Sequence, residues 1–127
     1  MRWHERDPRR LHLEHDLMER GTTARLVTWG NKLAWMEDLM SAGARQPYRL
    51  AIVYPKHFPY EAPRAYVLAP DVSGAPHRLS DGSLCLFDNP THPGVKTTAL
   101  VVRNRAVVWF LAYELWRATG EWMAPAH

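Results

Sequence analysis

The sequence contains a single cysteine, no long apolar run and no glycine-rich nucleotide-binding loop. One thiol cannot form a disulfide within the chain, and no stretch approaches the roughly 20 apolar residues of a membrane-spanning helix. The N-terminus is polar and lacks the apolar segment of a secretory signal. An unpaired thiol without an export signal predicts a protein of the cytoplasm.

The distribution of charge argues against a nucleic-acid partner. The 127 residues carry 16 Lys and Arg against 13 Asp and Glu, a net charge of +3 at pH 7. Acidic side chains are interleaved with the cations, as between Arg9 and Arg20. A nucleic-acid footprint would instead be a one-sided basic stripe with aromatic residues along it. The length and the 46% hydrophobic content predict one globular domain over residues 1–127.

An amphipathic helix is predicted near the N-terminus. Asp7 is a good N-cap, and Pro8 fits the first helical position. The helix is expected to end at about Arg20, before Gly21. Helical spacing places three side chains on its buried face, with Leu13 and Leu17 beside them. The three are Leu11, His15 and Met18.

A twofold period replaces the helical one after this helix and predicts four strands. The first, Thr23–Trp29, is followed by Gly30-Asn31, a dipeptide typical of a tight hairpin turn. The second is Lys32–Leu39, the third runs from Tyr48 to Tyr54, and the fourth is Arg64–Ala69. Sequential strands with short links favour an antiparallel meander.

The rest of the chain is a long loop and a second helix. From Pro70 to about Thr98 no period is visible, and a loop of this length in a small domain is usually functional or disordered. Apolar and aromatic residues at helical spacing then predict a helix ending at Gly120, whose stripe covers the sheet. The stripe is Val102, Ala106, Trp109, Phe110, Tyr113 and Trp116. We therefore expect an α+β fold.

The link between the third and fourth strands, from Tyr54 to Pro63, carries prolines at every fourth position. Proline cannot donate to a sheet ladder, so this segment must leave the sheet as a stiff bend. We expect a rigid corner buried by Phe58 and Tyr60, without a catalytic role.

Cys85 follows an Asp-Gly turn in the middle of the long loop, eight residues after His77. A free cysteine with apolar neighbours is more often an unreactive side chain packed in the core than a nucleophile. A cysteine beside a turn, with histidine within reach, is also typical of a nucleophile. The local residues leave both interpretations open.

The proline link Tyr54–Pro63, a strand, His77 and the Asp81–Leu86 segment occur in an order that resembles the ubiquitin-conjugating (carrier) enzyme family. The tryptophan-rich segment Trp109–Trp122 is similar to the bacterial branch found in anti-phage operons, especially cyclic-oligonucleotide (CBASS) systems and ubiquitin-like conjugation operons. The resemblance covers roughly residues 8–122. It implies a minimal version of that fold: N-terminal helix, four-strand antiparallel meander, cysteine-bearing loop and C-terminal helix, without the two final helices of the eukaryotic members.

The resemblance also implies roles for individual residues. Cys85 would accept a C-terminal acyl group as a thioester, and His77 matches the family's histidine, which mainly holds the loop through hydrogen bonds. Independently of the resemblance, turn chemistry predicts that Asp81 with Gly82 forms the turn that presents the cysteine. Asp88 would orient an attacking lysine, and His92 would face the incoming amine or thiol, although an exposed loop histidine is the more common case.

One element of the eukaryotic pattern is missing. That pattern has His-Pro-Asn before the cysteine, whereas His77 is followed here by Arg78-Leu79. No asparagine is in place to stabilise an oxyanion. Backbone amides near Cys85, or the Ser83 hydroxyl, are the expected donors to a tetrahedral intermediate.

The resemblance further implies protein partners. In CBASS-type relatives, the conjugated protein is a cGAS-like nucleotidyltransferase, joined through its C-terminus. The alternative is a separate ubiquitin-like protein. The chain has no nucleotide loop with which to adenylate a C-terminus, so a separate activating enzyme would supply the activated donor, unless the system works without one.

Two other classes of function remain as alternatives, and no cofactor is expected. The first is a non-catalytic binding module of the same fold. The second is a cysteine hydrolase that uses Cys85 with His77 or His92. The pair His12 and His15 could share a metal, but without a third ligand nearby a solvated helix face is the favoured interpretation.

Overall fold

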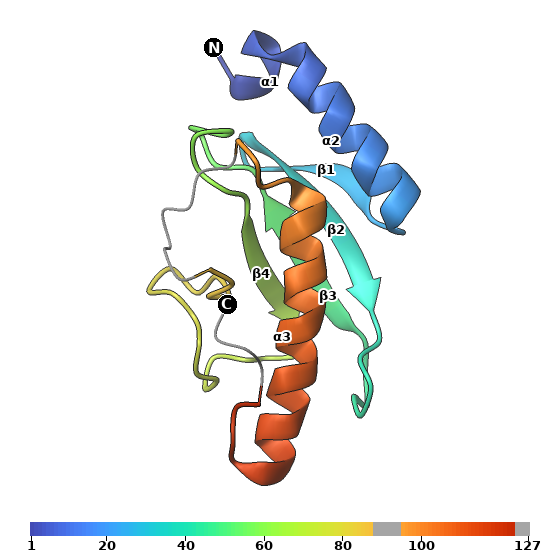
Figure 1. Cartoon of the computed structure of the whole chain (residues 1–127), viewed down its shortest axis with the longest axis vertical. Helices are drawn as coiled ribbons and strands as arrows, with labels where there is room; N and C mark the ends of the chain where they lie inside the picture. Colours follow the sequence, from blue (N-terminus) through green and yellow to red (C-terminus); the bar gives the residue numbers. More distant parts are fainter. Residues whose placement is uncertain (88–94, 124–127) are drawn as a thin grey trace.

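The computed structural model describes residues 1–87 and 95–123 and has the predicted α+β architecture (Figure 1). All four predicted strands are present, with ends that differ by at most two residues, and both long helices are confirmed. The elements are α1 (Trp3–Arg6), α2 (Pro8–Gly21), β1 (Arg25–Trp29), β2 (Lys32–Leu39), β3 (Tyr48–Val53), β4 (Arg64–Ala69) and α3 (Ala99–Thr119).

The short helix α1 was not predicted. Four residues are too few for a helical period to be visible in the sequence. Tertiary packing holds this turn, because Trp3 is only 5% exposed. Its ring lies 4.9 Å from Tyr54 and 4.6 Å from Phe58, centroid to centroid.

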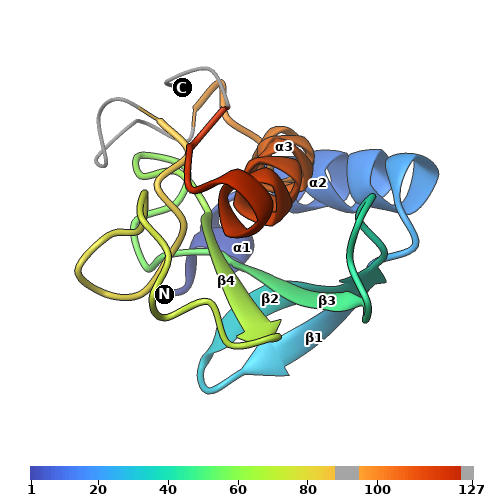
Figure 2. The same ribbon diagram turned by 90° about the horizontal axis from the view of Figure 1, so that it is seen from below.

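The sheet is an antiparallel meander in the order β1-β2-β3-β4. Gly30, with φ of +63°, makes the hairpin turn between β1 and β2. Both long helices lie on the same side of the sheet (Figure 2). Alternation along β3 sends Leu50 and Ile52 into the main core beneath α3, while Ala51 and Val53 belong to a smaller apolar cluster on the opposite face.

The aromatic stripe of α3 forms the roof of the core, as predicted. Trp109 and Phe110 are 3% and 1% exposed, and Trp116 at the end of the stripe is half-buried. The Phe110 ring stacks on Tyr48 at 4.3 Å. Among the residues that the structure describes, neither α3 nor any other helix combines the length and apolarity needed to cross a bilayer.

Two expectations about buried side chains were wrong. Glu14, not His15, lies on the buried face of α2, and Leu13 is 46% exposed. In the link between β3 and β4, Phe58 is fully buried, but Tyr60 is 71% exposed. The error on α2 has a physical cause, because the carboxylate of Glu14 finds hydrogen-bond donors inside the protein that no local pattern reveals.

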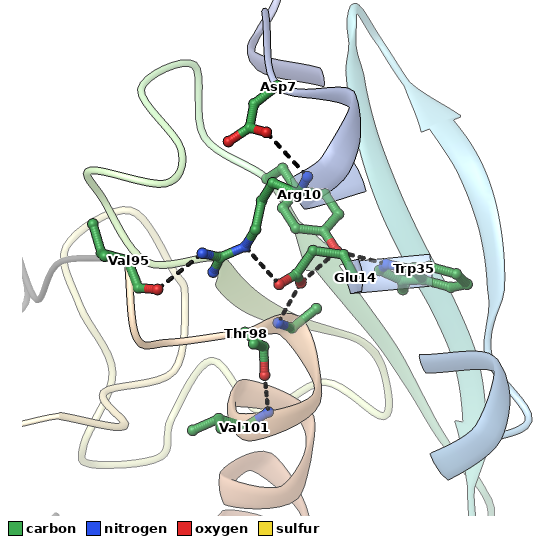
Figure 3. Close-up of polar contacts among 9 residues, drawn as sticks. Asp7, Arg10, Glu14, Trp35, Val95, Thr98 and Val101 are labelled. Carbon is green, nitrogen blue, oxygen red and sulfur yellow. Dashed lines mark hydrogen bonds and ion pairs between the residues drawn. The ribbon is translucent and has the colours of Figure 1, made fainter. Parts of the chain in front are cut away.

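The three donors to Glu14 come from α2 itself, from the residue that follows β3 and from the start of α3 (Figure 3). Glu14 Oε1 accepts hydrogen bonds from the Tyr54 hydroxyl and from the main-chain N–H of Ala99, both at 2.8 Å. Its Oε2 accepts from Arg10 Nε at 3.1 Å. Trp35 Nε1 donates to the Tyr54 oxygen at 2.9 Å. Burial and the charge of Glu14 raise the pKa of Tyr54 well above its ordinary value, so the phenol keeps its proton and donates.

This network also fixes both ends of the segment that leads into α3. Ala99 is the first residue of α3, and Thr98 caps the helix by accepting from the N–H of Val101. Arg10 reaches the carbonyl oxygen of Val95 at 2.8 Å (Figure 3). The position of α3 on the sheet is therefore set partly by a carboxylate on α2.

A second buried carboxylate, Glu37 on β2, makes stability depend on pH. Its side chain is 2% exposed and lies 2.9 Å from Arg103 Nε on α3. Burial raises the pKa of Glu37, but hydrogen bonds from Arg103 and Thr23 and the charge of Arg103 outweigh it and leave the pKa below the ordinary value of 4.5. A carboxyl with a lowered folded-state pKa stabilises the protein above its unfolded pKa and loses that contribution as the pH falls through the folded-state pKa.

We therefore expect the free energy of unfolding to fall as the pH is lowered below about 4.5, and Glu37→Gln to make this fall shallower. Urea denaturation at a series of pH values measures the free energy of unfolding and its slope against pH. Glu121→Gln, at an exposed position, is the control and should leave the slope unchanged. An identical slope for wild type and Glu37→Gln would contradict the assignment.

Candidate functional site

Cys85 belongs to the segment that follows β4 and precedes α3 in the sequence. This segment is drawn in yellow to gold in Figure 1. Its neighbours Leu84 and Leu86 are 4% and 7% exposed and belong to the main core, whereas Cys85 itself is half-buried. The N–H of Leu84 donates to the carbonyl of Ala65 at 2.9 Å, which ties the segment to β4. The apolar neighbours thus anchor the segment that carries the half-buried Cys85, whose Sγ lies 3.7 Å from the Phe87 carbonyl oxygen.

His77 holds this segment through its main chain. Its carbonyl oxygen accepts the N–H of Cys85 at 2.9 Å and the indole Nε1–H of Trp109 at 3.0 Å. Its φ is +58°, a left-handed conformation that costs a non-glycine residue about 1–2 kcal/mol. The imidazole packs on Trp122 beyond the end of α3, with ring centroids 4.8 Å apart. The hydrogen bonds that hold this segment come from the main-chain carbonyl of His77. The loop-holding role that the resemblance implies for His77 stays a prediction.

Arg105 on α3 holds the other side of the cysteine. Its guanidinium donates to the carbonyl of Leu86 at 3.0 Å and lies 4.6 Å over the ring of Phe87. Arg105 and Trp109 are four residues apart and so share one face of the helix. One helix therefore binds a carbonyl on each side of Cys85. Neither residue was predicted to belong to the site, because a tryptophan in an apolar stripe and an exposed arginine carry no local signal of this function.

Asp81 and Ser83 form the turn before the cysteine. Asp81 Oδ1 accepts the N–H of Ser83 at 2.9 Å and its hydroxyl at 2.6 Å, and Gly82 between them has φ of +88°. Burial raises the pKa of Asp81, but the bonds from Ser83, the charge of Arg64 and the hydroxyl of Tyr66 together lower it below the ordinary value. Asp81 is therefore an anion that holds the turn through its hydrogen bonds to Ser83. That this turn presents the cysteine for reaction stays a prediction.

The predicted site residues are only partly brought together. Asp81, Ser83 and Cys85 lie in one turn, and His77 contacts it through its carbonyl. Ser83 is 1% exposed and its hydroxyl is bound to Asp81, so donation to an oxyanion would require that bond to break. This role for Ser83 stays a prediction.

Two further predicted residues, Asp88 and His92, lie outside the described residues. His12 and His15, for which a solvated helix face was favoured over a metal site, are both exposed on α2, and His15 Nδ1 is 3.1 Å from Glu19 Oε2. Within residues 1–87 and 95–123, no three His, Cys, Asp or Glu side chains converge as a metal site would require.

A hollow of about 20 Å³ lies beside Cys85. Its walls come from the end of the proline link, the start of β4 and the cysteine segment. They are Ala62, Pro63, Arg64, Ala65, Leu79, Ser83, Leu84, Cys85, Leu86 and Phe87. A space of this size holds about one water molecule, so a group attached to Cys85 must extend over the surface.

A four-strand meander roofed by one long helix, with a half-buried cysteine held in an ordered loop, defines a minimal ubiquitin-conjugating-like protein. The model of one family, described as Type II CBASS E2 protein, matches residues 14–127, and the chain belongs to this family. Membership gives it a role in CBASS anti-phage defence and protein partners from that system. No curated protein matches the sequence.

Proposed function

We propose that this protein carries an acyl group on Cys85, as a thioester with the C-terminus of a partner protein. The observation that carries the proposal is the placement of Cys85: the chain's one thiol is half-buried, and α3 binds the carbonyls of Leu86 and His77. The His77 carbonyl also accepts the N–H of Cys85. A positioned nucleophile needs this kind of fixed main chain. Membership of a family of conjugating-type proteins supports the same chemistry.

The first step would be attack by Cys85 Sγ on the carbonyl carbon of an activated C-terminus. The C–S bond forms while the bond to the leaving group breaks, and the thiol proton leaves to solvent or to the departing group. The donor is either an acyl adenylate, which releases AMP, or a thioester on a separate activating enzyme, which releases that enzyme's thiol. In the second step an amine or thiol takes the acyl group and Cys85 recovers its proton, unless the covalent complex is the end product.

The partner we propose is a cGAS-like nucleotidyltransferase, joined through its C-terminal carboxyl. A separate ubiquitin-like protein is the second candidate. The two are distinguished by the mass of the adduct when the protein is incubated with each partner and the activating enzyme from the same operon.

The test is an adduct gel run with and without reducing agent. The wild-type protein should form an adduct band that disappears on reduction. Cys85→Ala should form less than about one hundredth of the wild-type amount of this adduct, since the chain has no other thiol. Cys85→Ser should give an oxyester band that survives thiols but not alkali. Ser80→Ala, an exposed change five residues away, is the matched control.

Three results would overturn the proposal. An adduct that persists in Cys85→Ala would show that a residue other than Cys85 accepts the acyl group. If Cys85→Ala leaves both partner binding and phage defence intact, the protein is a non-catalytic binding module. Turnover of a peptide or thioester without any lasting or transferable adduct would instead favour a cysteine hydrolase.

A further inference from the structure

The donors closest in sequence to Cys85 are already engaged in other hydrogen bonds. Both the hydroxyl and the N–H of Ser83 donate to Asp81 Oδ1. The N–H of Leu84 donates to a main-chain carbonyl of β4, and the N–H of Cys85 donates to the carbonyl of His77. Acyl transfer develops negative charge on the carbonyl oxygen, and that charge is stabilised by donors aimed at the oxygen. A donor from another part of the fold is therefore needed.

Two of the arginines around the cysteine segment already have an anionic neighbour. Arg64 lines the small hollow beside the thiol and lies 3.7 Å from Asp81 Oδ2. Arg78, whose main chain bridges to the cysteine segment, has Asp71 as its neighbour. Hydrogen bonds from Ser73 and then the charge of Arg78 lower the pKa of Asp71, so this carboxyl is an anion. The positive charges of both arginines are therefore compensated locally.

The charge of Arg105 on α3 is not compensated in this way. Within residues 1–87 and 95–123, no carboxylate lies within 4.0 Å of its guanidinium. One N–H donates to the Leu86 carbonyl, and the central carbon of the group lies 4.6 Å from the centre of the Phe87 ring. Stacking uses the face of a guanidinium and leaves its N–H edges able to donate. Arg105 thus brings a charged donor against both residues that follow Cys85.

The contacts of Arg105 also suit a donor that is in place before the reaction. The hydrogen bond to Leu86 and the stacking on Phe87 hold its guanidinium against the same main chain that carries the thiol. Donors that are fixed in advance need no reorganisation when charge develops. The side chain is exposed, so an acyl group attached at the half-buried Cys85 can approach it from solvent.

We propose that Arg105 donates a hydrogen bond to the oxyanion that forms during acyl transfer to Cys85. As Sγ attacks the carbonyl carbon, the C–S bond forms and the C=O electron pair moves onto oxygen, where the guanidinium N–H donates to it. The pair then returns and the bond to the leaving group breaks. Arg105 keeps its proton throughout, because a guanidinium is not deprotonated in proteins. The inference rests on the proposed function, since it assigns a further residue to the same reaction.

The experiment compares two reactions of the same thiol in the full chain. The first is acylation by a neutral peptide ethyl thioester, which needs no activating enzyme and releases ethanethiol. The second is alkylation by iodoacetamide. Both require attack by Cys85, but only acylation passes through a carbonyl oxyanion. A residue that only positions or ionises the thiol changes both rates, whereas an oxyanion donor changes acylation alone. Intact mass measured over time gives each second-order rate constant.

Arg105→Gln removes the charge and keeps an amide that can donate to the Leu86 carbonyl. We expect acylation to slow by about 30-fold and alkylation by less than about threefold. The loss is smaller than the roughly 100-fold or more of an enclosed oxyanion hole, because water reaches this exposed side chain. Arg105→Lys supplies a charged donor and should recover acylation to within about fivefold of the wild-type rate.

The matched control is Arg45→Gln. It removes the same charge at an exposed position in the connection between β2 and β3, outside the hollow beside Cys85. Both reactions should keep their wild-type rates in this variant.

Equal slowing of acylation and alkylation in Arg105→Gln would overturn the inference, because Arg105 would then act on the position or ionisation of the thiol. Unchanged acylation in Arg105→Gln, or equal losses in Arg105→Gln and Arg105→Lys, would also overturn it. Failure of the proposed function is a separate result: iodoacetamide would alkylate the wild-type thiol, but neither the peptide thioester nor the operon partners would acylate it.

Discussion

Replacing Glu14 by alanine should lower the free energy of unfolding by about 3–5 kcal/mol, one of the two largest effects expected of any single change in this chain. The carboxylate is 1% exposed and accepts three hydrogen bonds inside the protein. Removing it takes away the carboxylate that lies 3.1 Å from Nε of the Arg10 guanidinium, which is 11% exposed. It also leaves the N–H of Ala99 at the start of α3 without that acceptor. Breaking one partner of a buried charge network costs more than the network contributes, because the remaining groups stay desolvated.

Urea denaturation followed by circular dichroism measures this loss. Glu14→Gln keeps the shape and one carbonyl acceptor and should lose less, so it gives a measurable value if the alanine variant does not fold. Glu19→Ala on the same helix is the control. Its carboxylate is 69% exposed and pairs only with His15 among the described residues, so its loss should be below about 1 kcal/mol. Similar losses at positions 14 and 19 would show that the network is not what anchors α3.

Trp109→Ala should cost a similar amount, about 3–5 kcal/mol, for a different reason. The indole is 3% exposed and fills the space between Tyr113, stacked at 5.3 Å, and Trp122 at 5.2 Å. Alanine would leave a cavity beside the cysteine segment and also remove the donor to the His77 carbonyl. The stability loss should therefore be accompanied by opening of the segment that holds Cys85.

Trp109→Phe separates the hydrogen bond from the packing. It keeps most of the aromatic volume but leaves the His77 carbonyl with the N–H of Cys85 as its remaining main-chain donor. A lost bond of about 1.4 kcal/mol corresponds to a tenfold increase in local opening. We expect hydrogen exchange at the Cys85 amide to accelerate by about that factor.

The matched control is Trp116→Phe, the same change two turns further along α3. Trp116 is half-buried, and its indole makes no hydrogen bond within the described part of the chain. Exchange at Cys85 should stay at the wild-type rate in this variant. Equal acceleration in both would mean that general loosening of α3, and not the bond to His77, controls the cysteine segment.

Much of the architecture could be predicted because its signals are local. The strand periods, the Gly30-Asn31 turn and the stripe from Val102 to Trp116 each lie within one continuous segment, and burial follows their periodicity. Tyr60 shows the limit of this reasoning. Prolines indicate that the chain bends there, but not which side chain of the bend faces the core.

The candidate site was predictable only in part, because only some of its residues are neighbours in the sequence. Cys85 and the Asp81 turn are neighbours in sequence, so their arrangement follows from a short motif. Arg105 and Trp109 come from 20 or more residues further along the chain, and nothing in their local pattern distinguishes them from ordinary helix residues.

By itself, the sequence determined the order and kind of the main elements and the presence of one thiol in a long loop. Those properties depend on hydrophobic period and turn chemistry, which act over a few residues. Only the tertiary structure decided that Glu14 is buried and that α3 holds the main chain around Cys85. Each of these depends on donors and acceptors that meet across 19 to 85 residues of sequence, because a buried polar group must find a partner wherever the fold provides one.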